Sequence, residues 1–270
     1  MRLRGQFILG CALALTVTPA LANGHGPVFG LATPTNGKGA WTLDFAPMFR
    51  AGRAGEAAEA EMMRAMLTYG LTANWEISFS APAMLGNTRR PAARLTGMMA
   101  ANGEFEALTG WRFQRREPAV GLRRESTAYF GVDVPGPQAS QGKGVYAAVA
   151  TGLASRTNYL WAGVGDQYLS AGGQKAALNT AFYSLVYGYR PFAARQHYPG
   201  LDWRVFAELT GEHDSTVRSS GDQVFLGPSV LLIHKDIGFS AGVQWPIYSG
   251  GGAGFRPERH RVVIDVSYFF

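Results

Sequence analysis

Cysteine is almost absent from this sequence, and its absence excludes several kinds of site. Cys11 is the only cysteine among 270 residues. A lone thiol cannot build a disulfide framework or a thiolate metal cluster within the chain. We also expect Cys11 to leave with a cleaved leader, after which the chain has no thiol nucleophile. The folded protein must therefore be stabilised by other means.

Long apolar runs and dense charge are also missing. Beyond residue 22 no apolar stretch reaches about 18 residues, the length that a membrane-spanning helix needs. Charged residues make up 16% of the chain, against about 25% in ordinary soluble domains. The formal net charge is +6, and the basic residues are scattered along the chain. The composition therefore gives no support for a nucleic-acid partner.

The first 22 residues are typical of a secretory signal peptide. Arg2 and Arg4 give a basic start, residues 7–17 form an apolar run, and Ala-Leu-Ala at 20–22 is a small-x-small cleavage pattern. An alternative is a lipoprotein signal, because Ile-Leu-Gly-Cys at 8–11 resembles a lipobox. Too few apolar residues precede that cysteine, so we expect a cleaved, secretory leader.

The rest of the chain alternates between apolar and polar residues in segments of about ten, the pattern of transmembrane β-strands. In one segment Trp41, Leu43 and Phe45 alternate with Thr42 and Asp44. About twelve such segments predict an all-β protein, a single antiparallel up-and-down barrel, because lipid cannot satisfy an open sheet edge. The predicted divisions are a signal peptide at 1–22, an N-terminal periplasmic segment or plug at 23–40, and the outer-membrane barrel at 41–270.

The connections support this strand order. Short turns should lie on the periplasmic side of an even-numbered barrel and follow its even-numbered strands. Connections at 72–74, 155–158 and 234–236 are short and follow such strands. Two others on that side, at 115–124 and 191–201, are longer than the rule expects and leave a strand miscount open.

The last strand predicts where the protein resides. Phe270 ends an alternating apolar strand, with Tyr268 two residues before it. A terminal aromatic on the last strand resembles the signal that the barrel-assembly machinery reads, whereas the alternative is the final strand of a soluble sandwich. We expect an outer-membrane location, with outer-membrane lipids and, through Phe270, the assembly machinery as partners.

Several stretches share strand-and-turn patterns with a known family. They are Gly-His-Gly-Pro at 24–27, Phe-Gly-Leu-Ala-Thr-Pro-Thr at 29–35, Leu-Thr-Tyr-Gly-Leu-Thr-Ala-Asn-Trp-Glu-Ile-Ser at 67–78, Gly-Pro-Ser at 227–229 and Gly-Val-Gln-Trp-Pro-Ile-Tyr at 242–248. Together they resemble the MetA-pathway of phenol degradation family of outer-membrane proteins, over most of the chain beyond the leader. The resemblance implies a transporter of hydrophobic or aromatic compounds. Some similar proteins are associated with metal resistance, and the resemblance supplies no catalytic residues.

Polar residues of the inward-facing parity predict the lining of the barrel. If the aromatic and aliphatic side chains face lipid, the alternate residues face inward. The inward charged residues are Asp44, Arg64, Glu76, Glu106, Arg112 and Asp265. One interpretation is a network of paired charges that fills a narrow barrel. The other is a pore for a small-molecule solute, whose selectivity these charges tune, with Asp44, Arg64 and Glu76 as the first candidates.

Two metal hypotheses follow from the residue types. Cleavage after Ala22 would leave Asn23, Gly24 and His25 at the N-terminus, where an amine, two amide nitrogens and an imidazole suit Cu(II) or Ni(II). The inward methionines are Met48, Met62 and Met66. Thioethers bind Cu(I), although methionine more often fills gaps in apolar surfaces.

Catalytic residues and cofactors are not predicted. The only adjacent histidine, acid and serine are His213, Asp214 and Ser215, which we expect in an outer loop. The leading hypothesis is an outer-membrane channel or transporter for small molecules. The alternatives are a metal-resistance-associated barrel, a barrel enzyme and a structural barrel.

Overall fold

The computed structural model describes residues 26–51, 60–84, 97, 103–173, 176–191, 200–255 and 257–270. The predicted signal peptide at 1–22 lies outside the described residues, and so do Asn23, Gly24 and His25 of the first metal hypothesis. Within the described ranges, no helix is long and apolar enough to cross a membrane.

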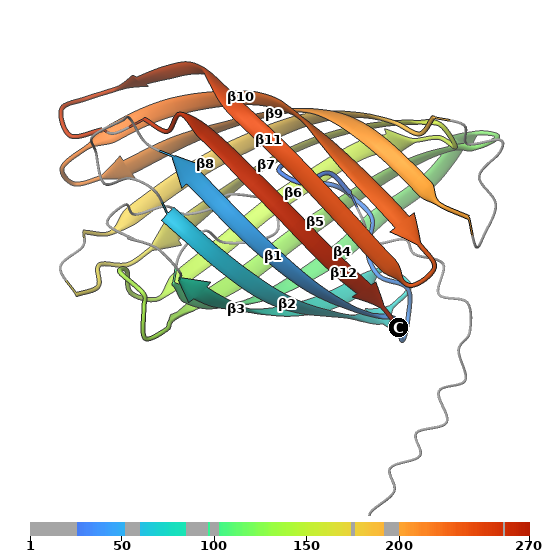
Figure 1. Ribbon diagram of the computed structural model, residues 1–270. Coiled ribbons are helices and arrows are strands. Elements are labelled where there is room, and N and C mark those ends of the chain that lie inside the picture. The colour runs from blue at the N-terminus through green and yellow to red at the C-terminus, as the bar shows by residue number, and fades with distance from the viewer. Residues whose placement is uncertain are drawn as a thin grey trace, which may run out of the picture.

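Twelve antiparallel strands close into one barrel, as Figure 1 shows, and this confirms the predicted fold class and strand number. Each strand pairs with its neighbours in the sequence, and β1 pairs with β12. The strands are β1 (Trp41–Ala51), β2 (Ala60–Thr72), β3 (Trp75–Met84), β4 (Glu104–Ala119), β5 (Leu122–Pro135), β6 (Gly144–Ala154), β7 (Asn158–Leu169), β8 (Leu178–Tyr189), β9 (Asp202–Thr216), β10 (Ser220–His234), β11 (Ile237–Gly251) and β12 (His260–Phe269).

The barrel closes at the two ends of its chain. The Trp41 amide donates to the Phe270 carbonyl oxygen (2.8 Å), and the Phe270 amide donates to the Trp41 carbonyl oxygen (3.1 Å). The ladder between β1 and β12 continues from there to the pair of Ala51 and His260. Every strand thus has two hydrogen-bonded neighbours, and the sheet presents no open edge to lipid.

The outer face of the barrel is apolar. Every second residue of β1 is buried, and the alternate positions carry the exposed Trp41, Phe45 and Phe49. Other strands expose similar side chains, such as Phe79 and Val164, which are 59% and 62% exposed. A continuous surface of this kind is stable in contact with acyl chains rather than water. The protein is therefore an outer-membrane β-barrel.

Aromatic side chains gather at one end of this apolar surface. The Trp41 ring lies 4.4 Å from the Tyr69 ring and 6.2 Å from the Phe270 ring, measured between ring centroids. The Trp111 and Phe113 centroids are 5.8 Å apart on the same barrel end. Such a girdle is typical of the interface between lipid and water, where amphipathic rings reach the headgroups.

Tight turns join the strands at the same end, which we call the inner end. The predicted short connections at 72–74, 155–158 and 234–236 are confirmed there. The inner end faces the periplasm, because bacterial barrels place their short turns on that side. The longer connection expected at 191–201 includes residues 192–199, which lie outside the described residues.

A further tight turn corrects one expectation. The connection expected at 115–124 is mostly strand, because β4 runs to Ala119 and β5 begins at Leu122. Gly121 has a φ of 73°, a left-handed conformation that glycine adopts without strain. The prediction was wrong because it relied on apolar alternation, whereas this hairpin is polar and extends past the apolar surface with its backbone groups still paired.

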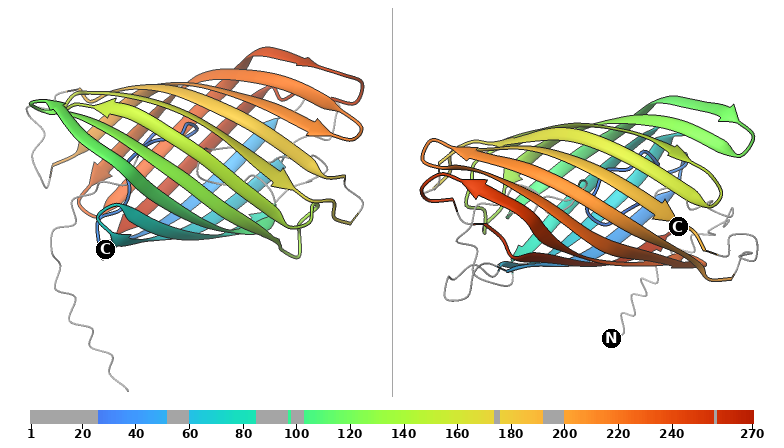
Figure 2. Two further views of the ribbon diagram at one scale, coloured as in Figure 1. Left: turned by 180° about the vertical axis from the view of Figure 1, so that it is seen from behind. Right: turned by 90° about the horizontal axis from the view of Figure 1, so that it is seen from above.

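The lumen of the barrel is occupied by the chain that precedes β1. Figures 1 and 2 show this segment, residues 26–40, curled inside the barrel. Its apolar side chains pack on inward-facing residues of the wall: Val28 and Phe29 lie in one cluster with the three inward methionines, and Leu31 in another with Tyr129. We call residues 26–40 the N-terminal segment. The division of the chain at residues 22 and 40 stays a prediction.

Candidate functional site: the occupied lumen

A buried carboxylate binds the start of the N-terminal segment in the lumen. Glu208, in the middle of β9, accepts hydrogen bonds from the amides of Val28 (2.9 Å), Phe29 (2.8 Å) and Gly30 (2.8 Å). The Ser229 hydroxyl donates to the same carboxylate. Hydrogen bonds to a charged acceptor are about twice as strong as neutral ones. Glu208 therefore anchors three consecutive backbone amides to the wall.

The next residues of the segment bind side chains from other strands. The Leu31 amide donates to Ser184 Oγ (3.0 Å). The Tyr129 hydroxyl donates to the carbonyl oxygen of Ala32 (2.7 Å), and Thr127 Oγ1 donates to that of Thr33 (2.6 Å). These bonds satisfy backbone groups that would otherwise be buried without partners. Residues 28–33 of the segment therefore bond to side chains of the wall and, among the described residues, to none of its backbone groups.

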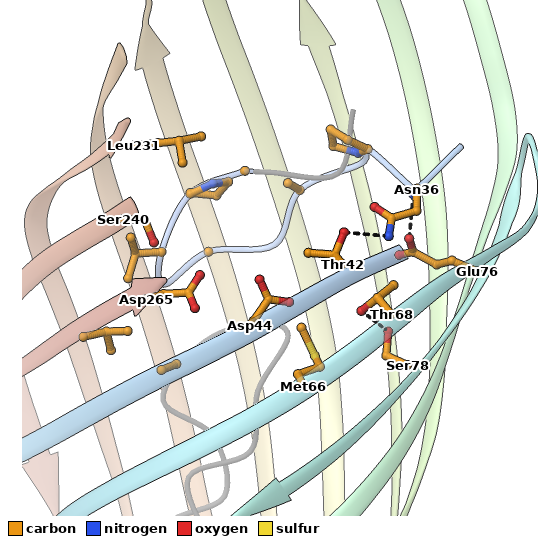
Figure 3. A pocket seen from close by; sticks show the side chains of 18 of the residues that line it. Asn36, Thr42, Asp44, Met66, Thr68, Glu76, Ser78, Leu231, Ser240 and Asp265 are labelled. Carbon is orange, nitrogen blue, oxygen red and sulfur yellow. Dashed lines mark hydrogen bonds between the residues drawn. The ribbon is translucent and has the colours of Figure 1, made fainter. Parts of the chain in front are cut away.

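Figure 3 shows how the segment returns to the wall at the start of β1. The Asn36 amide donates to Glu76 Oε2 (2.7 Å), and Asn36 Nδ2 donates to Thr42 Oγ1 (2.9 Å). The Gly39 amide then donates to the Gly70 carbonyl oxygen (2.8 Å). Glu76, a predicted lining residue, therefore accepts a hydrogen bond from the N-terminal segment.

The segment is also contacted from the outer end of the barrel. Gly97 belongs to the connection between β3 and β4, and its amide donates to the Phe29 carbonyl oxygen (2.7 Å). The Tyr146 hydroxyl donates to the Gly97 carbonyl oxygen (2.7 Å), so Gly97 lies between the segment and β6. An outer connection and the N-terminal segment therefore meet inside the lumen.

A cavity of about 120 Å³ remains between the segment and the wall. Its polar lining includes Asp44 from β1, Glu76 from β3, and Ser240 and Asp265 from the last strands. Figure 3 shows the Asp44 and Asp265 carboxylates beside each other on the cavity's floor, below the segment. Met66 supplies an apolar part of the same surface. The cavity is large enough for a few water molecules or a small polar group.

The six predicted lining residues lie in three parts of the lumen: around the cavity, toward the outer end and at the inner end. Asp44, Glu76 and Asp265 surround the cavity. Arg64 is fully buried and donates to Ser80 Oγ (2.7 Å) and to the Glu104 carbonyl oxygen (3.0 Å), both toward the outer end. Their role in a pore stays a prediction.

The two remaining candidates are also buried in the wall. Glu106 lies opposite Ser80 in the ladder between β3 and β4. Arg112, at the inner end, donates to Glu125 Oε1 (3.3 Å) and to Asn74 Oδ1 (3.1 Å). The ion pair of Arg112 and Glu125 agrees with the interpretation that opposite charges fill part of the lumen.

The outer-loop prediction for His213, Asp214 and Ser215 was wrong, because these residues belong to β9. Successive side chains of a strand point to opposite faces, so the three cannot converge. His213 Nδ1 lies 2.7 Å from Asp222 Oδ1, and Asp214 accepts a hydrogen bond from Thr180. The cluster therefore does not form a catalytic triad.

The anchoring residues were not recognised as a site in the sequence. Glu208 and Ser184 have the inward parity, but their partners are backbone amides far away in the sequence. Glu208 is 180 residues from Val28, and Ser184 is 153 residues from Leu31. A side chain that binds a backbone amide needs no complementary residue type, and so leaves no paired pattern in the sequence. The sequence feature that could have indicated the site is Glu208 itself, an acidic residue at an inward-facing position of an apolar strand.

No family model matches this chain, and no curated protein matches it. Among solved structures, the NanC porin is 12% identical, with 84% of this chain and 98% of that chain covered and a TM-score of 0.49. For LpxR from Salmonella typhimurium the identity is 13%, the coverage 86% and 100%, and the TM-score 0.42. For the beta domain of the Bordetella autotransporter BrkA the values are 10%, 87% and 100%, and 0.44. The chain is an outer-membrane β-barrel on the evidence of its own closed sheet and apolar outer face.

Proposed function

We propose that this protein is an outer-membrane channel or transporter for small molecules whose lumen is closed by the N-terminal segment and opens when that segment leaves Glu208. The observation that carries the proposal is the set of three amides on the buried Glu208 carboxylate. A closed barrel without such a segment would hold only side chains or water in its lumen.

The N-terminal segment can leave the wall without disrupting any strand. The twelve strands pair with each other, and residues 26–38 belong to none of them; only Gly39 and Ala40 bond to the backbone of β2, where β1 begins. Departure of the segment therefore breaks its hydrogen bonds to wall side chains and to Gly97, each worth about 0.5–3 kcal/mol net, and local apolar contacts. The barrel ladder stays intact, so opening does not require the membrane-embedded sheet to unfold.

The wall beneath the segment favours a hydrophobic or aromatic solute. Leu31 packs in a cluster with Tyr129 and Tyr146, and Ala32 packs against one with Trp161 and Phe206. When the segment leaves, these rings become the lining of the route. Aromatic linings bind flat apolar solutes by offset stacking, which agrees with the transport of aromatic compounds that the family resemblance implies.

The other functions have less support. Within the described ranges, no group of three or more His, Cys, Asp or Glu side chains is placed to hold a metal ion. The inward methionines pack in an apolar cluster with Val28 and Phe29, which supports their role as packing residues. We therefore favour a channel over a metal-binding barrel.

Single-channel conductance in a planar bilayer tests the proposal. The chain refolded from residue 23 onward should be mostly closed. Glu208→Gln removes the charge that strengthens three hydrogen bonds, so its open fraction should rise by about ten-fold. Deletion of residues 26–36 should give a steadily open pore.

Asp133→Asn is the matched control, because Asp133 is a buried carboxylate of the same lumen that accepts a hydrogen bond from Gln167 (2.8 Å). It should leave gating unchanged. Equal, steady conductance of the wild type and Glu208→Gln would show that the segment is not a gate. A deletion variant that folds but stays silent would exclude a channel.

A further inference from the structure

A second hollow opens at the inner mouth of the barrel. It measures about 360 Å³ and lies between Pro34 of the N-terminal segment and the inner ends of the wall strands. Its charged lining residues are Glu117, Arg123, Arg156, Arg190 and Arg204. Four guanidinium groups and one carboxylate give the hollow a formal excess of three positive charges. We call it the basic vestibule.

Carboxylates beside the vestibule pair with some of its arginines. Arg190 Nε lies 2.7 Å from Asp202 Oδ1, and Arg204 Nη2 lies 3.0 Å from Asp202 Oδ2. One aspartate therefore serves two arginines.

Glu125 is shared even more widely. Its Oε1 lies 3.3 Å from Arg112 Nη1, 3.8 Å from Arg115 Nε and 3.9 Å from Arg123 Nη1. The distance to Arg123 is at the limit of an ion pair, and the Arg123 side chain is 36% exposed. Arg123 is therefore weakly held by protein and accessible from the vestibule.

Ring contacts fix the position of the Arg204 guanidinium, and one of its N–H donors has no acceptor among the described residues. Its guanidinium lies 5.4 Å from the centroid of the Tyr159 ring, and Tyr159 stacks on Trp161 at 5.3 Å. Trp161 in turn packs against Phe206. Arg204 Nε is buried and has no hydrogen-bond partner among the described residues. A buried N–H without an acceptor is unfavourable, so a bound oxygen atom would stabilise this arrangement.

We propose that the basic vestibule binds a small solute that carries a carboxylate or phosphate group, with Arg204 and Arg123 as its ligands. Guanidinium groups match the geometry of both oxyanions. The volume lies within the range of about 300–1,000 Å³ that is usual for small-molecule sites. The site deepens the proposed function by naming the charge of its solute, yet binding at the mouth does not require the lumen to open.

The test is isothermal titration of the detergent-refolded chain from residue 23 onward, at low ionic strength. Benzoate and inorganic phosphate are the anionic probes, and benzyl alcohol is the neutral counterpart of benzoate. Benzoate, phosphate or both should bind with one site per chain, and the stronger probe identifies the anion source. Benzyl alcohol should bind at least about ten-fold more weakly than benzoate, because its hydroxyl group carries no charge to pair with a guanidinium.

Three variants locate the site. Arg204→Met keeps an apolar stem over Tyr159 and removes the charge, so affinity should fall about ten-fold, while Arg204→Lys should retain part of it. The matched control is Arg218→Met, because Arg218 is exposed in the turn between β9 and β10 at the outer end. If Arg204→Met fails to fold, Arg123→Gln on the inner hairpin provides the same test.

The outcomes are distinct. Saturable anion binding that is lost in the Arg204 or Arg123 variant and kept in Arg218→Met supports the site. Absence of binding in the wild type, or equal loss in the Arg204 and Arg218 variants, overturns it. Neither result depends on conductance. The binding experiment can therefore contradict the anion site without contradicting gating by the N-terminal segment, and conductance can contradict gating without contradicting the anion site.

Discussion

Gly30 lies where the N-terminal segment comes closest to the wall. A Cβ atom at this position would lie 2.4 Å from Val186 Cγ2 and 3.3 Å from Ser184 Cβ. Both distances are shorter than ordinary van der Waals contact, so a side chain at Gly30 forces the segment or the facing side chains of β8 to shift. Gly37, in the same segment, has no atom within 4 Å of the corresponding position.

This pair of glycines gives a direct prediction. Gly30→Ala should displace the segment from Glu208, because the added methyl group collides with the wall of β8. Limited proteolysis of the folded barrel should then cleave the segment faster, by about ten-fold for a loss of about 1.4 kcal/mol. Gly37→Ala is the control and should leave cleavage unchanged. Equal cleavage rates in the two variants would mean that close packing at Gly30 does not retain the segment.

The strands of the wall were predictable, because each residue faces either lipid or the lumen and the environment changes at every step. Alternation therefore located the strands, and parity identified the inward set, which includes Asp44 and Glu76. The contacts of the lumen were not predictable, because Glu208 and Tyr129 bind backbone groups of a distant segment. The residues next to Glu208 and Tyr129 in the sequence give no indication that the N-terminal segment is their partner.

The hairpin between β4 and β5 carries its own prediction. Gly121 closes the turn at a φ of 73°, where an L residue costs about 1–2 kcal/mol. Gly121→Ala should therefore lower the free energy of unfolding by about 1 kcal/mol, measured by urea titration of the refolded barrel. Val120→Ala, at the neighbouring exposed position, should have a smaller effect. A Gly121 variant as stable as Val120→Ala would show that the turn adjusts its backbone without cost.

The barrel as a whole separates two structural tasks. The closed ladder satisfies the backbone within the membrane, and it does so with wall strands alone. The N-terminal segment fills the space that this ladder leaves, using side-chain hydrogen bonds and small apolar clusters. The segment precedes β1 and is tied to the wall at Glu76 and Glu208, so its proposed release requires these side-chain bonds to break but no strand to separate. The proposed opening therefore leaves the membrane-spanning ladder unchanged.

A disulfide that ties the segment to the wall tests this opening. The Cβ positions of Gly30 and Ser184 are 3.3 Å apart, close to the separation of about 3.5–4.5 Å in disulfides. Gly30→Cys with Ser184→Cys, in a chain without residues 1–22, has no other thiol. We expect the oxidised protein to be closed. Reduction should open it beyond the wild type, because a side chain at Gly30 then pushes the segment off the wall.

A matched disulfide within the wall distinguishes gating from general rigidity. Gly238 and Ser267 lie on β11 and β12, and their Cβ positions are also 3.3 Å apart. Gly238→Cys with Ser267→Cys joins two wall strands and leaves the segment unattached. Its conductance should be the same in oxidised and reduced form. If the two pairs respond alike to reductant, wall motion controls the pore; if only the Gly30 pair responds, the N-terminal segment is the moving part, and the barrel keeps its shape as the lumen opens.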